Sequence, residues 1–218
     1  MNIDVKKINS KETYDFILHK HYAQRKPSIS YAFGLFIDDK LEGILTIGKP
    51  ASNSLCECVC GKEFKQYVYE LNRLCVNDGL PKNTLSKFVS TVLKKLSTER
   101  IILVSYADEG MNHHGYIYQA TNWMYTGKTK EQRDTYAPNN KHSRHADAKS
   151  NEYKHLKQFR TSKFRYIYIP NKKFKKECLK RLQLPILEYP KGDNKRYVLG
   201  ERMKKKVINT ETGEIFYE

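Results

Sequence analysis

The stretch that decides the fold is QYVYELNRLCVNDGLPKNTLSKFVSTVLKKLSTERIILVSYAD, residues 66–108. Residues 66–76 alternate between apolar and polar side chains, which predicts a strand. Apolar residues recur at helical spacing from Leu85 to Leu96, after a turn at 78–81 and with Asn83 as the expected cap, so a helix follows. Residues 101–108 form a short apolar run that predicts a buried strand. The stretch is therefore a strand, a crossover helix and a second strand.

Outward from this stretch, the same patterns extend the sheet on both sides. Residues 11–22 carry one apolar helical face, and two strands at 30–37 and 41–47 form a hairpin. A short helix at 115–122 and strands at 123–127 and 163–170 follow. This order predicts a single α+β domain over residues 1–218, with a mixed central sheet flanked by helices. Residues 128–162 are expected to form a basic surface insertion, and residues 203–218 a tail.

The charge is concentrated in the second part of the chain. Of a formal net charge of +16 over 218 residues, +13 falls on residues 128–218. Tyr, Phe, Arg and Lys are interleaved there, which favours a nucleic-acid partner over a solvated basic face without a partner. An anionic membrane surface is disfavoured because no strongly amphipathic basic helix stands out.

Neither a membrane span nor a signal peptide is expected. No stretch approaches the roughly 20 apolar residues of a membrane helix, and the first residues lack an apolar segment behind their positive charges. A cytoplasmic protein with reduced thiols is the expectation. Cys56, Cys58 and Cys60 alternate, which predicts partly buried thiols on a strand or loop. A structural metal is the alternative, although Cys75 and Cys178 are isolated and supply no second pair.

Several motifs together resemble a known family. They are HYAQR (21–25), ELNRLCV (70–76) with LPKNTLSKF (80–88), SYADEG (105–110), HHGYIYQATNW (113–123), HSRHADAKS (142–150), KFRYIYI (163–169) and YPKGDNKRY (189–197). Their order resembles the GCN5-related N-acetyltransferase (GNAT) fold and, within it, the Mom family of phage DNA-modification proteins. The resemblance implies modification of the N6 amino group of adenine to a carbamoylmethyl (acetamido) form, which protects phage DNA from restriction nucleases in the host cytoplasm. It implies acetyl-CoA as the donor.

The resemblance also implies a cofactor site before the central helix. GNAT proteins hold the CoA pyrophosphate on a glycine-containing loop at a helix N-terminus. The glycines are missing here, but the helix start remains, with the cofactor-binding candidates Arg73, Lys82, Asn83, Thr84 and Ser86. The alternative is that Asn83 and Ser86 only cap the helix. Arg73 has a further alternative, a salt bridge to Glu70 or Asp108, because a charge on a central strand is rarely unpaired.

The catalytic candidates are Tyr118, Asp108, Arg73, His21 and Tyr22. Tyr118 matches the GNAT helix tyrosine that protonates the leaving thiolate, although a tyrosine beside Trp123 can equally be core packing. His21, Tyr22 and Asp108 offer an imidazole, a phenol and a carboxylate, a donor set that can hold iron. The resemblance to the Mom family favours this metal hypothesis. The alternative for His21 is an ordinary buried histidine.

Double-stranded DNA is the expected partner. Because N6 lies inside the duplex, the adenine is expected to be flipped or locally unpaired. The candidates for phosphate contacts are Arg25, Lys141, Arg144, Lys149, Lys163 and Arg165. Two alternatives stay open: a GNAT-type acetyltransferase acting on tRNA or another acyl acceptor, and a non-catalytic nucleic-acid-binding protein. The oligomeric state is open as well, a homodimer included.

Overall fold

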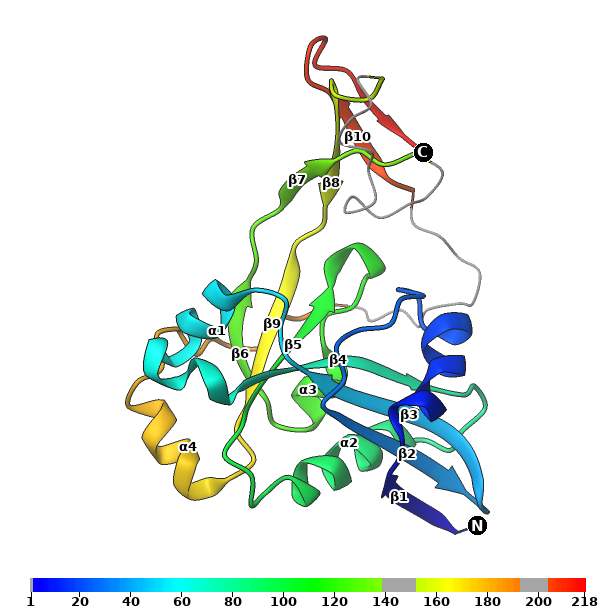
Figure 1. The fold of residues 1–218 in the computed structure, drawn as a ribbon, viewed down its shortest axis with the longest axis vertical. Coiled ribbons are helices and arrows are strands. Elements are labelled where there is room, and N and C mark those ends of the chain that lie inside the picture. Colours follow the sequence, from blue (N-terminus) through cyan, green and yellow to red (C-terminus); the bar gives the residue numbers. More distant parts are fainter. Residues whose placement is uncertain (1, 139–151, 193–203) are drawn as a thin grey trace.

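A seven-stranded sheet forms the centre of the protein (Figure 1). The computed structural model describes residues 2–138, 152–192 and 204–218. In spatial order the strands are β1 (Ile3–Lys7), β2 (Tyr31–Ile37), β3 (Lys40–Gly48), β4 (Val68–Val76), β5 (Ile102–Asp108), β9 (Lys163–Tyr168) and β6 (Met124–Lys128). Neighbours are antiparallel except β4 and β5, which are parallel. The predicted mixed α+β architecture is confirmed.

Helices cover both faces of this sheet. They are α1 (Asn53–Cys60), α2 (Thr84–Lys95), α3 (Tyr116–Ala120) and α4 (Lys172–Leu179). Phe88 and Val92 of α2 and Tyr118 of α3 pack in the cluster that contains Leu103. On the opposite face, side chains of α1 and α4 pack in a second cluster with Val104. No helix of the described residues has the length and apolar character that crossing a membrane requires.

Two of the predicted elements take another form. The predicted helix at 11–22 is helical but irregular, with a 3-10 turn at Ser10–Thr13 and a π-helical turn at Phe16–Lys20. It lies on the face of the sheet that α1 and α4 cover, where Phe16 and Ile17 pack on Ile44.

The cysteine-rich segment also differs from its prediction. It is not a strand or loop but helix α1, which Ser52 caps by accepting a hydrogen bond from the Leu55 N–H at 3.3 Å. At helical spacing the alternating cysteines spread around the helix, so Cys56 and Cys60 are buried and Cys58 is half-buried. All three are free thiols, and no group of three potential metal ligands occurs among the described residues.

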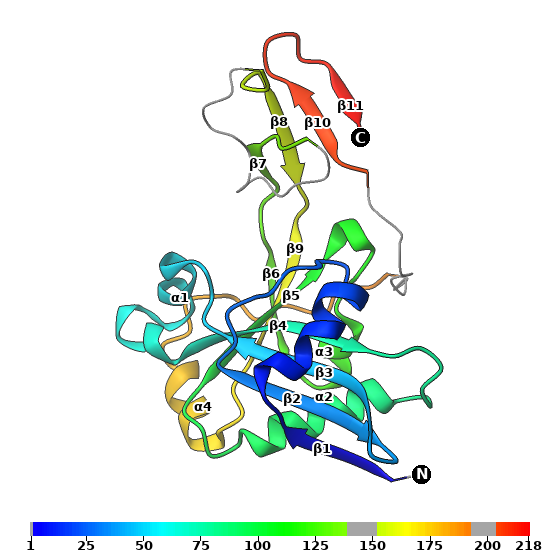
Figure 2. The ribbon, with the colours of Figure 1, turned by 45° about the vertical axis from the view of Figure 1, so that its right-hand side comes forward.

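A second sheet stands away from the main body (Figure 2). Its four strands, in spatial order, are β11 (Ile215–Tyr217), β10 (Lys206–Asn209), β8 (Leu156–Arg160) and β7 (Gln132–Thr135). These strands lie in the predicted surface insertion, residues 128–162, and the predicted tail, residues 203–218. They pair with each other around a small core of Tyr136, Leu156 and Val207. The boundary of one domain over the whole chain stays a prediction.

Strand β4 contains an extra residue, Asn72. Arg73 pairs with Thr46 and Leu71 pairs with Ile47, so Asn72 has no partner on β3. The Asn72 side chain accepts a hydrogen bond from the Thr46 hydroxyl at 2.6 Å and donates one to the Ser28 carbonyl oxygen at 2.8 Å. These two hydrogen bonds fix the bulge and hold the loop before β2 against the sheet.

The bulge changes which face Arg73 occupies. Glu70 lies opposite Gly48 and Arg73 lies opposite Thr46, two positions that share a face of β3. Strict alternation would have put Glu70 and Arg73 on opposite faces. The prediction of a regular alternating strand over 66–76 is therefore wrong at Asn72, and both charged side chains lie on the side of the N-terminal helical segment.

We expect Gly48→Ala to destabilise the protein through this contact. A Cβ atom at Gly48 would lie 1.8 Å from the Ser28 carbonyl oxygen and 3.0 Å from the Asn72 amide nitrogen. The free energy of unfolding should fall by about 2 kcal/mol or more, because the backbone of the loop has to move. Gly213→Ala is the control, since its Cβ meets nothing within 4 Å and only its positive φ of 76° is strained. Urea denaturation should show a cost of about 1 kcal/mol there, and equal costs at the two sites would contradict the account.

Candidate active site

Strands β4 and β5 pair over three residues and then separate. Their parallel ladder joins Val68–Glu70 to Ile102–Val104 and stops there, although β4 continues to Val76 and β5 to Asp108. Beyond the ladder, the Ser105 hydroxyl lies 2.8 Å from the Leu71 carbonyl oxygen. The two strands therefore diverge beyond Leu71, and the candidate residues lie along their diverging halves.

Arg73 is a buried cation without an acidic partner. Its side chain is 9% exposed and donates to two backbone carbonyl oxygens, that of Asn72 at 2.6 Å and that of Arg25 at 2.8 Å. The buried Nε has no hydrogen-bond partner among the described residues. No carboxylate of the described residues pairs with it, so the expected alternative of a salt bridge to Glu70 or Asp108 is wrong. Burial lowers the pKa of the Arg73 guanidinium, and an anion bound there would compensate the desolvated charge.

His21 is held neutral next to this arginine. Its Nδ1 accepts a hydrogen bond from the Ala23 N–H at 3.0 Å, so the ring proton sits on Nε2. Burial lowers the pKa of His21 to about 3, and the positive charges of Arg73, His113 and Lys163 act in the same direction. At neutral pH His21 is therefore a hydrogen-bond donor through Nε2 and carries no charge.

Tyr22 stacks on His21. The ring centroids are 4.4 Å apart, and Tyr22 also meets the edge of His113 at 6.1 Å. Burial, followed by the negative charge of Asp108, raises the pKa of Tyr22 to about 12. The phenol therefore stays protonated at neutral pH and can act as a hydrogen-bond donor.

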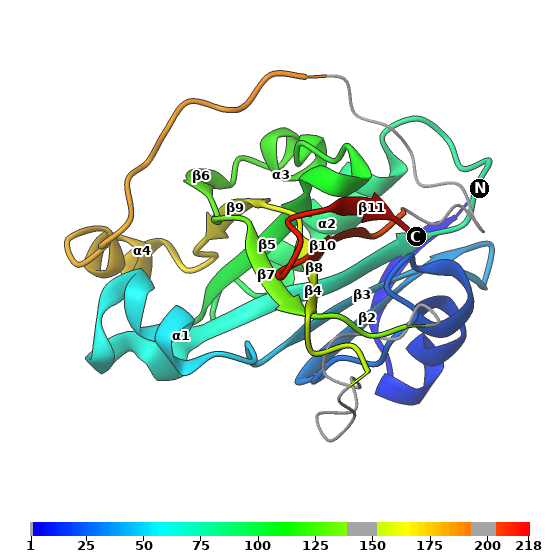
Figure 3. The same ribbon diagram turned by 90° about the horizontal axis from the view of Figure 1, so that it is seen from above.

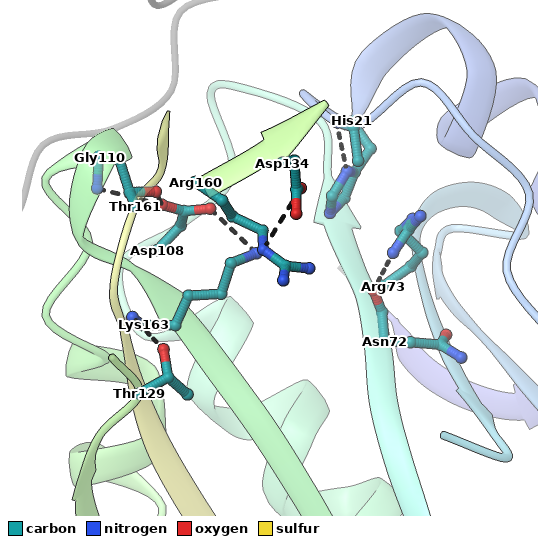
Figure 4. Close-up of polar contacts among 11 residues, drawn as sticks. His21, Asn72, Arg73, Asp108, Gly110, Thr129, Asp134, Arg160, Thr161 and Lys163 are labelled. Carbon is teal, nitrogen blue, oxygen red and sulfur yellow. Dashed lines mark hydrogen bonds and ion pairs between the residues drawn. The ribbon is translucent and has the colours of Figure 1, made fainter. Parts of the chain in front are cut away.

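Asp108 is held on the other side of the separation by three groups (Figure 4). Its Oδ1 accepts hydrogen bonds from the Gly110 N–H at 3.0 Å and the Thr161 hydroxyl at 2.7 Å. Its Oδ2 pairs with Lys163 Nζ at 3.1 Å. Figure 4 shows His21 and Arg73 across from this group, with Arg160 of the second sheet between them in that view. Arg160 itself lies 3.6 Å from the Asp134 carboxylate.

This arrangement does not fit the predicted iron site. The Asp108 carboxylate is already occupied by Lys163, and a bound ammonium excludes a metal cation from the same oxygen atoms. His21 lies where the charges of Arg73 and Lys163 already disfavour a positive charge on its ring. No cluster of three His, Cys, Asp or Glu side chains suited to a metal occurs within residues 2–138, 152–192 and 204–218. The iron hypothesis therefore has no support, and no step is assigned to a metal.

Tyr118 lies at the point where the two strands begin to separate. Its side chain is 7% exposed and packs against Trp123 and Tyr166, with ring centroids 5.1 Å away in both cases. Its hydroxyl is 2.7 Å from the Ser105 hydroxyl. Ser105 has one hydroxyl proton, and the Leu71 carbonyl oxygen can only accept a hydrogen bond. When Ser105 donates this proton to Leu71, the Tyr118 hydroxyl donates its own proton to the Ser105 oxygen. Burial raises the pKa of Tyr118, so the residue is a protonated phenol embedded in the core.

The start of α2 offers backbone donors and one nearby cation. Asn83 precedes the helix in a left-handed conformation with φ of 67°, and its side chain makes no capping hydrogen bond. The expected side-chain cap is therefore wrong for Asn83. The Thr84 and Ser86 hydroxyls donate to the carbonyl oxygens of Pro81 and Asn83, at 2.7 and 3.0 Å. Lys82 is exposed, so a helix N-terminus and an ammonium remain for an anion.

The predicted phosphate-contacting residues fall into two groups. Lys141, Arg144 and Lys149 lie outside the described residues. Of the others, Lys163 is paired with Asp108, and Arg165 donates to Thr126 at its hydroxyl (3.0 Å) and its carbonyl oxygen (2.9 Å). The Arg25 side chain is exposed, and its carbonyl oxygen anchors Arg73. A role for any of them in binding DNA stays a prediction.

Two residues of this region, Glu70 and Ser105, are not among the site residues predicted from the sequence. Glu70 shares the face of Arg73 because of the bulge, and burial raises the pKa of its carboxyl group. Ser105 links β4, β5 and α3 through its hydroxyl. The SYAD motif contained Ser105, but nothing in the local pattern distinguishes it from an ordinary strand residue. The position of Glu70 required the bulge, which the sequence does not reveal.

Comparisons with known proteins give a family. The model of the Mom protein family matches residues 2–191. A curated relative, the methylcarbamoylase mom of Escherichia phage Mu, is 34% identical over 115 residues, which cover 50% of this chain and 46% of that protein. The match thus spans about half the length of that relative.

Solved structures with a similar arrangement are acetyltransferases. A GNAT family acetyltransferase from Elizabethkingia anophelis, with acetyl-CoA bound, is 13% identical, with a TM-score of 0.46 over 77% of this chain and 98% of that one. An N-acetyltransferase from Staphylococcus aureus Mu50 is 11% identical, with a TM-score of 0.47 over 78% of this chain and all of the other.

The neutral state of His21 predicts a specific pH dependence. The pKa is about 3 in the folded protein and about 6.5 in the unfolded chain, so between these values the unfolded state binds more protons. The contribution of neutral His21 to the free energy of unfolding is therefore complete above pH 6.5. It is lost as the pH falls toward 3, and the free energy of unfolding then decreases by at most about 1.4 kcal/mol per pH unit.

Measuring the free energy of unfolding of the wild type and of His21→Phe between pH 7 and pH 4 isolates the contribution of His21, because both proteins contain all the other titrating groups. The wild type should lose more stability than the variant as the pH falls. NMR signals of the His21 ring should stay unchanged over that range, and a midpoint near pH 6 would contradict the assignment.

Proposed function

We propose, from the premise that the chain belongs to the Mom protein family, that it is a transferase that modifies the N6 amino group of adenine in phage DNA. The proposed product is an acetamido (carbamoylmethyl) adenine, which protects the DNA from host restriction. The observation that carries the proposal is Arg73, a buried guanidinium with an unpartnered Nε beside the uncharged His21 and Tyr22. A buried cation surrounded by neutral donors favours a ligand that carries negative charge or develops it during reaction.

The proposed donor is an acyl-CoA, in keeping with the family. When bound, acetyl-CoA would supply the two carbons of the added group. Attack of N6 on its thioester carbonyl would give an N6-acetyl group with the CoA thiol as leaving group, so the carbamoylmethyl form requires an oxidant and a nitrogen donor in addition. Lys82 and the backbone N–H groups at the start of α2 would bind its pyrophosphate, since both attract anions. Arg73 would donate from Nε to an acyl or phosphate oxygen, in a geometry that a lysine cannot reproduce.

Tyr118 is the proposed proton donor. Its hydroxyl lies where β4 and β5 separate, hydrogen bonded to Ser105, and its raised pKa keeps the phenol protonated at neutral pH. The proposed acceptor of the proton is the leaving thiolate of CoA. The proposed substrate is an adenine taken out of the duplex stack, because its amino group is otherwise inaccessible. His21 and Tyr22 would orient that base as uncharged donors.

Nucleoside mass spectrometry tests this function. We expect plasmid DNA from bacteria that express the wild type to contain a deoxyadenosine of increased mass, whose increment identifies the added group. Arg73→Lys and Tyr118→Phe should each reduce it by at least about 100-fold, because one removes the Nε donor and the other the proton. Soluble wild-type protein with unmodified DNA would contradict the function. Normal product with Tyr118→Phe would assign that residue to core packing.

Calorimetry with acetyl-CoA tests the donor separately. The wild type should bind it, and Lys82→Ala should weaken binding by about 2- to 5-fold, the usual value of one charge near a helix terminus. Lys95→Ala is the matched control, because Lys95 is also an exposed lysine but lies at the opposite end of α2. Folded wild-type protein that gives no heat of binding would exclude acetyl-CoA as the donor.

A further inference from the structure

One face of the second sheet carries cations and aromatic rings and no acidic residue. Cross-strand partners share a face, and the pairs Arg133–Phe159, Thr135–Lys157 and Lys206–Tyr217 all lie on it. Ile208, the partner of Lys157, belongs to the same face. We call it the outer face, made of Arg133, Thr135, Lys157, Phe159, Lys206, Ile208, Ile215 and Tyr217.

The opposite face is already used for folding. Leu156 and Val207 are buried there with Tyr136, and Phe216 packs against them. Asp134, the acidic residue within the four described strands, also belongs to that side and lies 3.6 Å from Arg160. None of the eight residues of the outer face belongs to a buried apolar cluster of the described residues. Arg133, Thr135 and Ile215 are exposed, Tyr217 is 63% exposed, and the other four are half-buried.

The cations of the outer face are arranged around one ring. Arg133 lies 5.2 Å and Lys206 4.5 Å from the centre of the Phe159 ring. Neither they nor Lys157 forms an ion pair with any carboxylate of the described residues. Arg133 and Lys206 stand on strands that flank β8, which puts them about 10 Å apart and lets them contact different phosphates. Cations around the half-buried Phe159 ring, with the exposed Tyr217 ring on the same face, form a pattern typical of surfaces that bind nucleic acids.

The second sheet is also tied to the candidate active site. Strand β8 runs into β9 through Thr161 and Ser162, and the Thr161 hydroxyl hydrogen bonds to Asp108 at 2.7 Å. Viewed from above, the sheet projects over β4 and β5 (Figure 3), and the other views show it standing beyond that end of the main body. A duplex held on the outer face is therefore carried at a fixed position relative to the separation of β4 and β5.

We propose that the outer face is a docking surface for the sugar–phosphate backbone of duplex DNA, beside the adenine that enters the active site. This inference rests on the proposed function for the choice of DNA as the polyanion. Each of the three cations contacts a phosphate and releases counterions, so each contributes about 0.9 to the slope of log affinity against log salt concentration.

Fluorescence anisotropy with a labelled 20-base-pair duplex, titrated at several salt concentrations between 50 and 200 mM, tests the inference. The triple variant Arg133→Gln, Lys157→Gln, Lys206→Gln should lower the salt slope by about 2 to 3 and the affinity at 100 mM by at least about 10-fold. The control is Lys172→Gln, Lys173→Gln, Lys176→Gln, three exposed lysines of α4. It removes the same charge and should leave the slope unchanged.

Single variants keep the test valid if the triple variant does not fold. Arg133→Gln and Lys206→Gln should each lower the slope by about 1. A slope equal to that of the wild type overturns the inference, as does stronger binding to an RNA duplex than to DNA. A wild-type dimer in light scattering that the triple variant loses, with DNA binding unchanged, would assign the face to a second copy of the chain and overturn it.

The same measurements separate this inference from the proposed function. Wild-type protein that leaves adenine unmodified, but whose DNA binding the triple variant weakens as expected, contradicts the function and supports the docking surface. Wild-type protein that modifies adenine, with a triple variant that binds normally, overturns the docking surface alone. Wild-type protein that binds no DNA overturns both.

Discussion

The extra residue in β4 is the constraint on which the candidate site depends. Asn72 shifts the register against β3, and its side chain is fixed between Thr46 and Ser28. The shift places Arg73 on the face of the N-terminal helical segment, where the Arg25 carbonyl oxygen receives its guanidinium. A regular strand would have pointed Arg73 into the apolar cluster under α2. The bulge thus converts a core position into a position for a polar site.

The electrostatics of the site follow from that placement. Arg73 forms no ion pair with a carboxylate in the part of the chain that the structure describes, and its charge contributes to the low pKa of about 3 at His21. Asp108 is close enough to raise the pKa of Tyr22, but its carboxylate is held by Lys163, Thr161 and the Gly110 N–H. The result is a pair of neutral donors next to a buried cation that forms no ion pair with a carboxylate of the described residues, although the charge of Glu70 on the same face acts on it. Such a group of donors is suited to an anionic ligand and unsuited to a metal ion.

The regular parts of the fold were predictable because their patterns are local. The hairpin of β2 and β3, helix α2 and strand β5 each carry an apolar period over seven or more residues. The second sheet was missed because its strands are only three to five residues long, because β7 and β8 each contain two charged residues, and because β8 pairs with β10 across about fifty positions. Short polar strands of this kind owe their stability to distant partners rather than to local propensity.

The site was predictable as a set of residues but not as an arrangement. Motif resemblance selected Arg73, Tyr118, His21, Tyr22 and Asp108. It could not show that Lys163 forms an ion pair with Asp108, or that Arg73 forms none with a carboxylate of the described residues. Both facts depend on contacts between distant segments. Glu70 was named only as a salt-bridge partner, because an extra residue in a strand leaves no mark in the alternation of side chains.

A crystal structure of the protein with acetyl-CoA tests the central claim most directly, because that claim concerns the place where the ligand binds. We expect the ligand to lie where β4 and β5 separate, with one of its oxygen atoms within hydrogen-bond distance of Arg73 Nε and its pyrophosphate at the start of α2. A ligand bound elsewhere, or Arg73 paired with Glu70 while the ligand is present, would contradict the account.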